Sequence, residues 1–404
     1  MAVGNDIGEG GGRVDWLMKT SGRLDSRAAS GLSAQTRRRT RLWREMGAAL
    51  AGFAITAATA TAMPPSLRVN GNHLETDRGE TVRLQGVNIP GLEWDPAGDH
   101  LQPTLEAALG PWHARVIRLP LSQDTWFGYF QRGHSTERRD AYRQLVDRVV
   151  RTIADKDAYV LLDLHWSDGG VWGQNVGQHA LPDDHSLRFW EDVAGRFANN
   201  PAVFFDLYNE PHDVSWELWR NGGMVEERNQ DPARGLKLTY HSPGMQALVN
   251  TVRSAGARNV VVAGGLNWAY DLRGILQGHA LTDLPGRGIV YATHLYPWKK
   301  DWDSNVTLVM AKYAVFVGEV GTKPWKTGEP AHENVYTESW APQVMAYLET
   351  HQLSWTAWSF HPGASPCLIN GWDYTPTAYW GSYVKEALAK AAAGAGKGPP
   401  SPRP

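Results

Sequence analysis

The chain has 404 residues, which is long enough for one large α/β barrel domain with extensions. Its 40 Lys and Arg residues nearly balance 42 Asp and Glu residues, so neither a basic nucleic-acid-binding surface nor an acidic solvating tail is indicated. The single cysteine, Cys367, excludes an intrachain disulfide bond and a cysteine-based metal site.

The first 62 residues have the character of a head and a signal segment. Residues 1–35 are rich in Gly, Ser, Asp and Arg without hydrophobic periodicity, which predicts disorder. An arginine cluster, 37–44, then precedes a mildly apolar segment, 46–62, that ends in an Ala-x-Ala pattern. This order is typical of a secretory signal peptide, so we expect a secreted (extracellular or periplasmic) protein. The apolar part is too short to span a membrane. A buried helix is the alternative interpretation, and the pattern fits general or twin-arginine export.

The rest of the chain is predicted to form one domain, 63–388, followed by a flexible Ala-, Gly- and Pro-rich tail, 389–404. The domain opens with two short apolar runs, 67–69 and 73–75, which are separated by an Asn-Gly pair. That pattern is a strong local signal for a β-hairpin. We expect this hairpin to cap the bottom of a barrel.

Eight strand-like segments follow, and helix-like segments separate them. The strands are predicted at 82–87, 116–120, 160–164, 203–207, 260–263, 290–293, 315–318 and 355–358. The helices are predicted at 104–109, 139–153, 186–197, 245–254, 271–276, 306–313, 339–349 and 379–389. This alternation predicts an α/β fold of the (β/α)8 TIM-barrel type. Three long strand-to-helix loops favour a shaped cleft for a polymer, because such loops build the active-site face of this fold. These loops are 167–184, 212–241 and 361–376.

Two of the strands end in a glutamate. The run Val203 to Leu207 stops at Asn209-Glu210-Pro211, where the proline can neither continue a strand nor let Glu210 become helical easily. About a hundred residues later, a second apolar strand ends at Glu319. Both carboxylates are therefore expected at the same rim of one barrel. Two carboxylates that flank one bond are what glycoside hydrolysis requires.

Polar or aromatic side chains also end four other strands. They are Arg118, His165, His294 with Tyr296, and Trp358. Taken singly, Arg118 could be a salt-bridge partner, His165 a hydrogen-bonded core histidine and Trp358 a core residue. Six such endings in register with six strands are hard to reach by chance, so we interpret them together as one catalytic rim.

The two glutamates receive different roles in this interpretation. Glu210, with a raised pKa, is the candidate general acid that protonates the glycosidic oxygen, and Glu319 is the candidate nucleophile. Arg118 and Tyr296 would keep Glu319 ionised and oriented. Asn209 would bind the sugar 2-hydroxyl, a contact that strengthens in the transition state.

The remaining rim residues are candidates for substrate binding. His165 and His294 can fix sugar hydroxyls and the carboxylates, and Trp358 can stack beneath the sugar at the cleavage point. No metal, nucleotide or other cofactor enters this scheme. A calcium-loop-like start at 301–305 lacks the Gly and the final Glu that an EF-hand requires.

These motifs resemble glycoside hydrolase family 5, in clan A, whose barrels carry two glutamates on the fourth and seventh strands. The resemblance covers residues 67–388 and includes an arginine, a histidine, an Asn-Glu pair, a His-x-Tyr motif, a glutamate and a tryptophan. The matching residues are Arg118, His165, Asn209, Glu210, His294, Tyr296, Glu319 and Trp358. The resemblance implies a retaining mechanism through a glycosyl-enzyme intermediate. It leaves the substrate open, because the family includes cellulases, mannanases and other specificities.

Tryptophan is unusually frequent, with 19 residues against 9 phenylalanines. Several lie in strand-to-helix loops, and Trp94, Trp172 and Trp298 are candidate stacking platforms for sugar faces. A row of platforms suits an unbranched β-1,4 chain such as cellulose or a soluble β-glucan. We therefore expect a secreted, monomeric, retaining endo-β-1,4-glucanase. A β-mannanase or a mixed-linkage β-glucanase is the alternative on the same scaffold, and a non-catalytic glycan-binding barrel is a remote one.

Overall fold

The computed structural model describes residues 63–130, 133–198, 200–228, 237–283, 285–324 and 337–395. The head and signal segment predicted at 1–62 lie outside the described residues, as do residues 396–404 of the predicted tail. Helix α10 (Trp380–Ala395) continues past the boundary predicted at 388, because the Ala-rich sequence there has high helix propensity. None of the helices in the described ranges has the length and apolar character that crossing a membrane requires.

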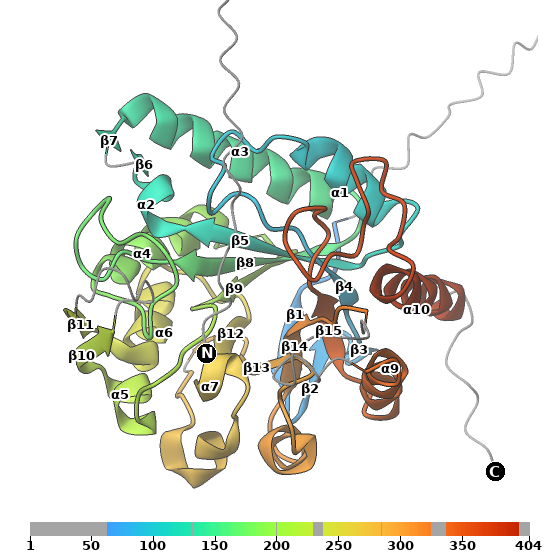
Figure 1. Ribbon diagram of the computed structural model, residues 1–404. Helices are drawn as coiled ribbons and strands as arrows, with labels where there is room; N and C mark the ends of the chain where they lie inside the picture. The colour runs from blue at the N-terminus through green and yellow to red at the C-terminus, as the bar shows by residue number, and fades with distance from the viewer. Residues whose placement is uncertain are drawn as a thin grey trace, which may run out of the picture. The chain divides into compact units, whose positions relative to one another are not determined.

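Eight parallel strands form a closed barrel, as the sequence predicts (Figure 1). In barrel order they are β4 (Gln85–Asn88), β5 (Val116–Ser122), β8 (Tyr159–Trp166), β9 (Val203–Asp206), β12 (Val261–Gly264), β13 (Ile289–Leu295), β14 (Val315–Val320) and β15 (Ser354–Ala357). Pairing of β15 with β4 closes the ring. Each strand overlaps one of the predicted segments, so the predicted (β/α)8 fold is confirmed.

Helices surround the barrel (Figure 1), and the longer ones bury an apolar face. The longer ones besides α10 are α1 (Leu101–Leu109), α3 (Thr136–Ala154), α4 (His185–Phe197), α6 (Gly244–Ser254) and α9 (Trp340–Thr350). In α4 the buried residues Phe189, Trp190, Val193 and Phe197 follow the helical period and pack against the strands. Serine is a favoured residue at a helix N-terminus, and the Ser135 side chain accepts a hydrogen bond from the Arg138 N–H at the start of α3.

Two predicted helices are irregular. The segment predicted at 271–276 forms a π-helical turn, η1 (Ile275–His279), and that at 306–313 forms a second one, η2 (Asp303–Thr307), followed by the short α8 (Leu308–Met310). Gly274 and Gly278 flank or interrupt η1, and Gly278 has a φ of 101°, which a regular α-helix does not accommodate. Both segments have apolar residues at helical spacing, but their backbones depart from regular α-helical geometry.

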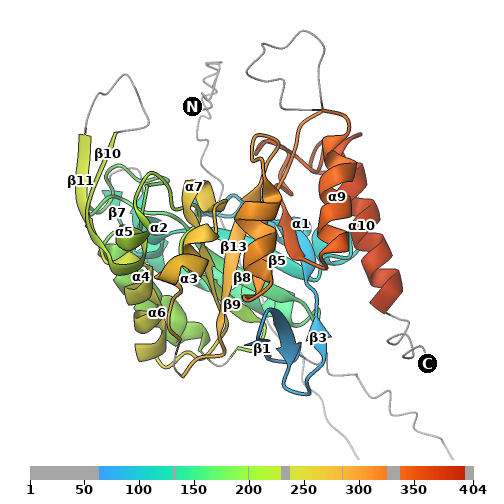
Figure 2. The same ribbon diagram turned by 90° about the horizontal axis from the view of Figure 1, so that it is seen from below.

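A small antiparallel sheet lies at the end of the barrel where the strands begin (Figure 2). It contains β1 (Leu67–Asn70), β2 (His73–Thr76) and β3 (Thr81–Val82). Leu67 and Leu74 join a buried cluster with Val116, Tyr159 and Phe204, which stand at or near the first positions of barrel strands. The apolar side of the hairpin is thereby buried against the barrel interior.

The opposite rim carries short elements that the sequence interpretation left as loops. After β5 come α2 (Gln123–Trp126), β6 (Tyr129–Phe130) and β7 (Gly133–His134). After β9 come α5 (Trp216–Asn221) and an antiparallel hairpin of β10 (Gly223–Arg228) and β11 (Lys237–Ser242), which projects from the edge of the barrel in Figure 2. After β12 comes the short turn α7 (Leu266–Ala269). These elements surround the ends of the strands that carry the two glutamates.

Candidate active site

The structure brings Glu210 and Glu319 together at this rim. Glu319 belongs to β14. Glu210 follows β9 in an extended segment whose backbone is hydrogen-bonded to the neighbouring strands. The Leu207 N–H donates to the Val262 carbonyl (2.9 Å), and the Asn209 N–H donates to the Leu164 carbonyl (3.0 Å). One oxygen of each carboxylate and a ring nitrogen of His294 all lie within 4.8 Å of one another. The two carboxylates therefore face a common space.

Glu319 is held by two donors. Arg118 Nη1 donates to its Oε1 (2.9 Å) and the Tyr296 hydroxyl donates to its Oε2 (2.6 Å). Burial and the charge of Glu319 raise the pKa of Tyr296 well above its usual range, so the phenol keeps its proton and remains a donor. With both oxygens engaged, the carboxylate is fixed in one orientation, as an attacking group must be.

Glu210 has a different environment. Its Oε1 lies 2.8 Å from His294 Nδ1, and its Oε2 accepts from Gln178 Nε2 (2.7 Å). Burial lowers the pKa of His294 to about 3, outweighing the opposing effect of Glu319, so the ring is neutral near pH 7. Because the buried His294 Nε2 has no hydrogen-bond partner among the described residues, we place the ring proton on Nδ1, where it is donated to Glu210. Glu210 thus receives neutral donors, whereas Glu319 is paired with a guanidinium.

Arg118 is the centre of the network beneath the glutamates. Besides Glu319, its guanidinium donates to Asp206 Oδ2 (2.8 Å) and Asn209 Oδ1 (2.8 Å) and forms an ion pair with Asp163 Oδ2 (3.0 Å). Burial favours the neutral form of Arg118, but the three carboxylates outweigh it and raise its pKa. Burial raises the pKa of Asp163 and of Asp206 to about 7 against the pull of Arg118. One fully buried cation therefore organises groups from four other strands, β4, β8, β9 and β14, and from the segment after β9.

Replacing Arg118 by methionine is expected to lower the free energy of unfolding by about 3–5 kcal/mol, because it leaves buried carboxylates without their cation. Urea unfolding monitored by tryptophan fluorescence measures this. The matched control is Arg115→Met, which removes an exposed ion pair with Asp157 and should cost at most about 1 kcal/mol. Equal losses in the two variants would contradict the assigned role of Arg118.

His165 and Trp358 form one wall of the site. His165 Nδ1 lies 2.6 Å from Asp163 Oδ2, and the imidazole stacks on Trp358 with ring centroids 5.7 Å apart at 12°. Burial and the neighbouring Arg118 lower the pKa of His165 to about 4, so this ring is neutral near pH 7. Trp358 is partly exposed. The wall therefore offers a neutral donor or acceptor beside an aromatic surface, which suits sugar binding.

The three loop tryptophans differ in their surroundings. Trp94 is 37% exposed and lies 5.7 Å from His361 between ring centroids, and Trp298 is 45% exposed and stacks on Tyr296 (4.8 Å, 5°). Trp172, in contrast, stacks in parallel on both His185 (3.7 Å) and Tyr129 (5.1 Å). Because protein rings already cover Trp172, we assign it to loop packing and leave it out of the proposed sugar platforms.

Several residues of the site are absent from the predictions. Asp163 and Asp206 could have been found, because Asp163 stands two residues before His165 and so points to the same face of its strand. Gln178 and Lys299 lie in loops, where no hydrophobic periodicity predicts which way a side chain points. Lys299 Nζ donates to the Asn267 carbonyl (2.6 Å) and lies 5.2 Å from the Trp268 ring centroid, at the end of the site nearer Glu210.

A further buried acid, Glu93, lies in the loop after β4. Its Oε2 accepts from the Gly91 N–H (2.8 Å), its Oε1 has no hydrogen-bond partner among the described residues, and burial raises its pKa to about 8. The folded protein therefore keeps this proton up to about pH 8, whereas the unfolded chain releases it near its ordinary pKa of 4.5. The contribution of Glu93 to stability is thus greatest at low pH and is lost as the pH rises.

We expect Glu93→Gln to gain stability relative to the wild type as the pH is raised from about 5 to about 8, since the variant has no proton to lose. Urea midpoints of both proteins at the two pH values measure the difference. The same substitution at the exposed Glu106 is the control and should show no such pH dependence. A Glu93→Gln difference that is constant with pH would contradict the raised pKa.

Comparisons with known proteins bear on the family. The model of the family described as Cellulase (glycosyl hydrolase family 5) matches residues 76–364. Among curated proteins, the chain is 23% identical to Endoglucanase MaCel5A of Microbulbifer sp. (strain ALW1) and 23% identical to an endoglucanase of Paenibacillus polymyxa. The first alignment covers 80% of this chain and 58% of the relative, and the second covers 81% and 88%. The chain thus spans little more than half of the Microbulbifer protein.

Solved structures share the fold. A β-glucanase of Saccharophagus degradans, SdGluc5_26A, solved in complex with cellotetraose, superposes with a TM-score of 0.63 at 24% identity, over 81% of this chain and 94% of that one. The catalytic domain of Thermobifida fusca endoglucanase Cel5A superposes with a TM-score of 0.58 at 19% identity, over 80% and 97%. At these identities the structures support the barrel, and the family model covers well over half of the chain. The chain therefore belongs to glycoside hydrolase family 5, the cellulase family.

Proposed function

We propose that this glycoside hydrolase is a retaining endo-β-1,4-glucanase that cleaves internal bonds of cellulose or a related β-glucan. The observation that carries the proposal is the pair Glu210 and Glu319, whose nearest carboxylate oxygens lie within 4.8 Å across the rim. Carboxyl groups of retaining glycosidases stand about 5–5.5 Å apart, whereas inverting enzymes leave roughly 6.5–9.5 Å for a water molecule. The close spacing favours direct attack by a carboxylate.

In the first step Glu319 attacks the anomeric carbon while Glu210 transfers its proton to the departing glycosidic oxygen. The C–O bond to the leaving sugar breaks and a glycosyl ester to Glu319 forms. In the second step Glu210, now a carboxylate, takes a proton from water, and the resulting hydroxyl displaces Glu319 with net retention. The neutral donors His294 and Gln178 can hold Glu210 in both protonation states, since a neutral donor adds no charge that would oppose proton uptake.

Asn209 is oriented for the sugar. Its Oδ1 accepts from Arg118, so its Nδ2 amide group remains to donate to an acceptor on the substrate. The sugar 2-hydroxyl is the group we assign to it, next to the anomeric carbon that Glu319 attacks. Tyr296 and Arg118 can stabilise the negative charge of Glu319, which is lost when the ester forms and regained when the ester is hydrolysed.

The assignment to a β-glucan rests on the aromatic surfaces and on the relatives. Trp94 and Trp298 are exposed loop tryptophans and Trp358 is partly exposed, and flat pyranose faces stack on such rings. The curated relatives are named endoglucanases, and a neighbour in fold was solved with cellotetraose. That neighbour is called a β-glucanase, a name wide enough to keep a mixed-linkage β-glucanase as the second candidate.

The test is release of reducing sugar from carboxymethylcellulose, barley β-glucan and β-mannan by the wild type and by Glu319→Gln. Activity on carboxymethylcellulose that disappears in the variant supports the proposal, and a fall in viscosity ahead of sugar release supports internal cleavage. Activity confined to barley β-glucan would establish the second candidate. Activity confined to mannan would overturn the substrate, and binding without hydrolysis would establish a glycan-binding barrel.

We also propose that the protein is secreted and acts as a monomer. Cellulose is too large to enter a cell, and one chain supplies all of the catalytic groups described above. Fractionation of the native host should place the protein outside the cytoplasm, and light scattering should give the mass of one chain. Accumulation in the cytoplasm would contradict secretion.

A further inference from the structure

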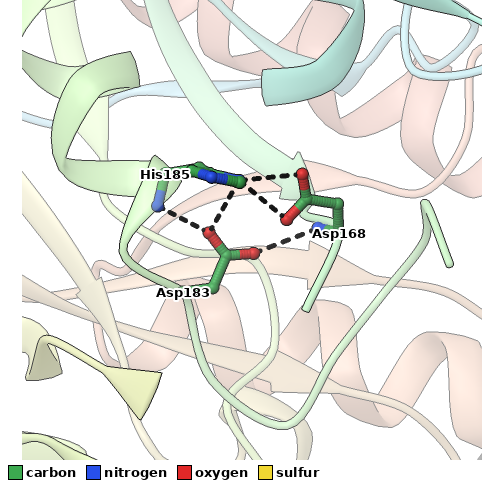
Figure 3. Close-up of side chains that lie close together, drawn as sticks. All are labelled: Asp168, Asp183 and His185. Atoms are coloured by element: carbon green, nitrogen blue, oxygen red, sulfur yellow. Dashed lines mark hydrogen bonds and ion pairs between the residues drawn. The ribbon is translucent and has the colours of Figure 1, made fainter. Parts of the chain in front are cut away.

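A second cluster of ionisable side chains lies outside the catalytic pair, at the two ends of the loop between β8 and α4 (Figure 3). Asp168 lies near the start of this loop, Asp183 lies near its end, and His185 is the first residue of α4. His185 Nδ1 lies 2.9 Å from Asp168 Oδ2 and 4.0 Å from Asp183 Oδ1. Figure 3 shows the three side chains pointing toward one another, and both carboxylates are fully buried. The cluster ties the two ends of the loop together.

A third carboxylate comes from another part of the barrel. Asp124, on α2 after β5, is fully buried and lies close enough to Asp168 and Asp183 to feel their charges. Its Oδ1 accepts from the Gly173 N–H (2.6 Å), but its Oδ2 has no hydrogen-bond partner among the described residues. A buried carboxylate oxygen without a donor is costly. Two buried carboxylates thus lie against one imidazole, and a third, Asp124, lies close to Asp168 with one oxygen that has no hydrogen-bond partner among the described residues.

We propose that Asp124, Asp168, Asp183 and His185 bind a divalent transition-metal ion of the Mn²⁺ or Zn²⁺ kind. Carboxylate oxygens together with one imidazole nitrogen suit such ions, whereas Ca²⁺ prefers oxygen ligands alone. Around an ion with bonds of about 2.1 Å, adjacent ligand atoms stand about 3 Å apart and opposite ones about 4.2 Å. The nitrogen-to-oxygen distances of 2.9 Å and 4.0 Å fit those two spacings.

The surroundings hold the ligands in place. Asp183 accepts hydrogen bonds from Gln123 Nε2 (3.0 Å) and from the backbone N–H groups of Asp168 (3.1 Å) and His185 (2.8 Å). The His185 ring lies flat against Trp172, with centroids 3.7 Å apart at 8°. Such contacts orient metal ligands before the ion arrives, and they resemble the outer shells of known sites. Trp172 thus acts on this site by holding an imidazole.

The ion has a consequence for the catalytic centre. The same loop carries Gln178, which donates to Glu210 Oε2, and an antiparallel bridge joins Ser167 to Gly177 inside it. An ion that fastens Asp168 and Asp183 to Asp124 on α2 would fix both ends of this loop. The position of Gln178 beside the acid would then depend on metal occupancy.

The experiment uses the full chain, stripped with a chelator and returned to metal-free buffer. Mn²⁺, Zn²⁺, Ca²⁺ and Mg²⁺ are titrated separately, with calorimetry for stoichiometry and Kd and with thermal unfolding for stability. We expect one equivalent of Mn²⁺ or Zn²⁺ and a rise in Tm, because an ion that binds only the folded state stabilises it. Asp124→Asn should weaken binding at least about tenfold, which corresponds to about 1.4 kcal/mol.

The matched control is Asp184→Asn, which removes a carboxylate from the next position of the same loop, where it pairs with the exposed His241. This variant should bind the ion as the wild type does. Without metal, thermal unfolding of Asp124→Asn beside the stripped wild type checks that the variant folds. Should it fail to fold, Asp168→Asn replaces it and is expected to lose the ion. Wild type that takes up no ion, a preference for Ca²⁺, or unchanged binding in Asp124→Asn would overturn the proposal.

Discussion

Glu319→Gly is expected to lower the rate of polysaccharide hydrolysis by on the order of 10⁵-fold, since it removes the proposed nucleophile while leaving the proposed acid in place. The space vacated lies between Arg118 and Tyr296, two donors that held the carboxylate. Azide can enter this space and attack the anomeric carbon directly. With an activated aryl cellobioside as substrate, azide should restore part of the rate and give the α-glycosyl azide, in which the configuration is inverted. Product configuration is measured by proton NMR.

The matched control for this variant is Glu319→Gln, which keeps the shape of the side chain and leaves no room for azide. It should be equally slow and should not respond to azide. A β-configured azide product from Glu319→Gly would contradict the nucleophile assignment, because inversion at a single displacement requires attack from the face that Glu319 occupies. Thermal unfolding of both variants checks that the barrel is intact.

Glu210→Ala is expected to slow hydrolysis of polysaccharide by about 10²–10⁴-fold, the usual contribution of a general acid. The leaving group decides the size of the effect. An unactivated sugar alkoxide needs the proton, whereas a dinitrophenolate does not, so the first step with a dinitrophenyl cellobioside should be nearly unaffected. The second step still needs a base, so the glycosyl-enzyme should accumulate. Stopped-flow measurement should therefore record a burst of dinitrophenolate followed by slow turnover.

Azide separates this role from that of Glu319. In Glu210→Ala, azide should speed the slow second step and give the β-glycosyl azide, with retention, because it displaces the glycosyl-enzyme from the face where Glu210 stood. Glu226→Ala, an exposed carboxylate on the nearby β10, is the control and should leave both steps unchanged. If dinitrophenyl and natural substrates lose rate equally in Glu210→Ala, the acid lies elsewhere.

The barrel could be predicted because its strands are short apolar runs that helices separate, and burial on both faces requires that pattern. The site followed from the same fact. Side chains at the carboxyl ends of parallel strands must meet at one rim, so Glu210 and Glu319 could be grouped without any view of their contacts. The sequence predicts Arg118 at the end of a strand that stops at residue 120, whereas β5 continues to Ser122 and Arg118 lies beneath the rim. The positions of strand ends do not predict which atoms contact each other. The structure adds that Glu319 is paired with a guanidinium, whereas Glu210 receives neutral donors.

Other features could not be read from the sequence, for physical reasons. The hairpin of β10 and β11 lies in a loop whose alternation is weak, although Val225 and Tyr240 form a cross-strand pair there. Gln178 reaches Glu210 from an irregular segment, and no period gives the direction of such a side chain. Trp172 carries a large apolar ring, but composition does not say whether sugar or protein covers it. The cluster around Asp124 joins three segments that only the closed barrel brings together.

Arg118 has a consequence for how the protein folds. Its hydrogen-bond partners Asn88, Asp206, Asn209 and Glu319 stand 30, 88, 91 and 201 residues away in the chain. Contacts of such long sequence separation form late, because closing a long loop costs entropy before any contact compensates for it. During refolding from urea, helical circular dichroism should therefore return first and enzymatic turnover last, so that turnover reports the moment at which the seventh strand joins the barrel.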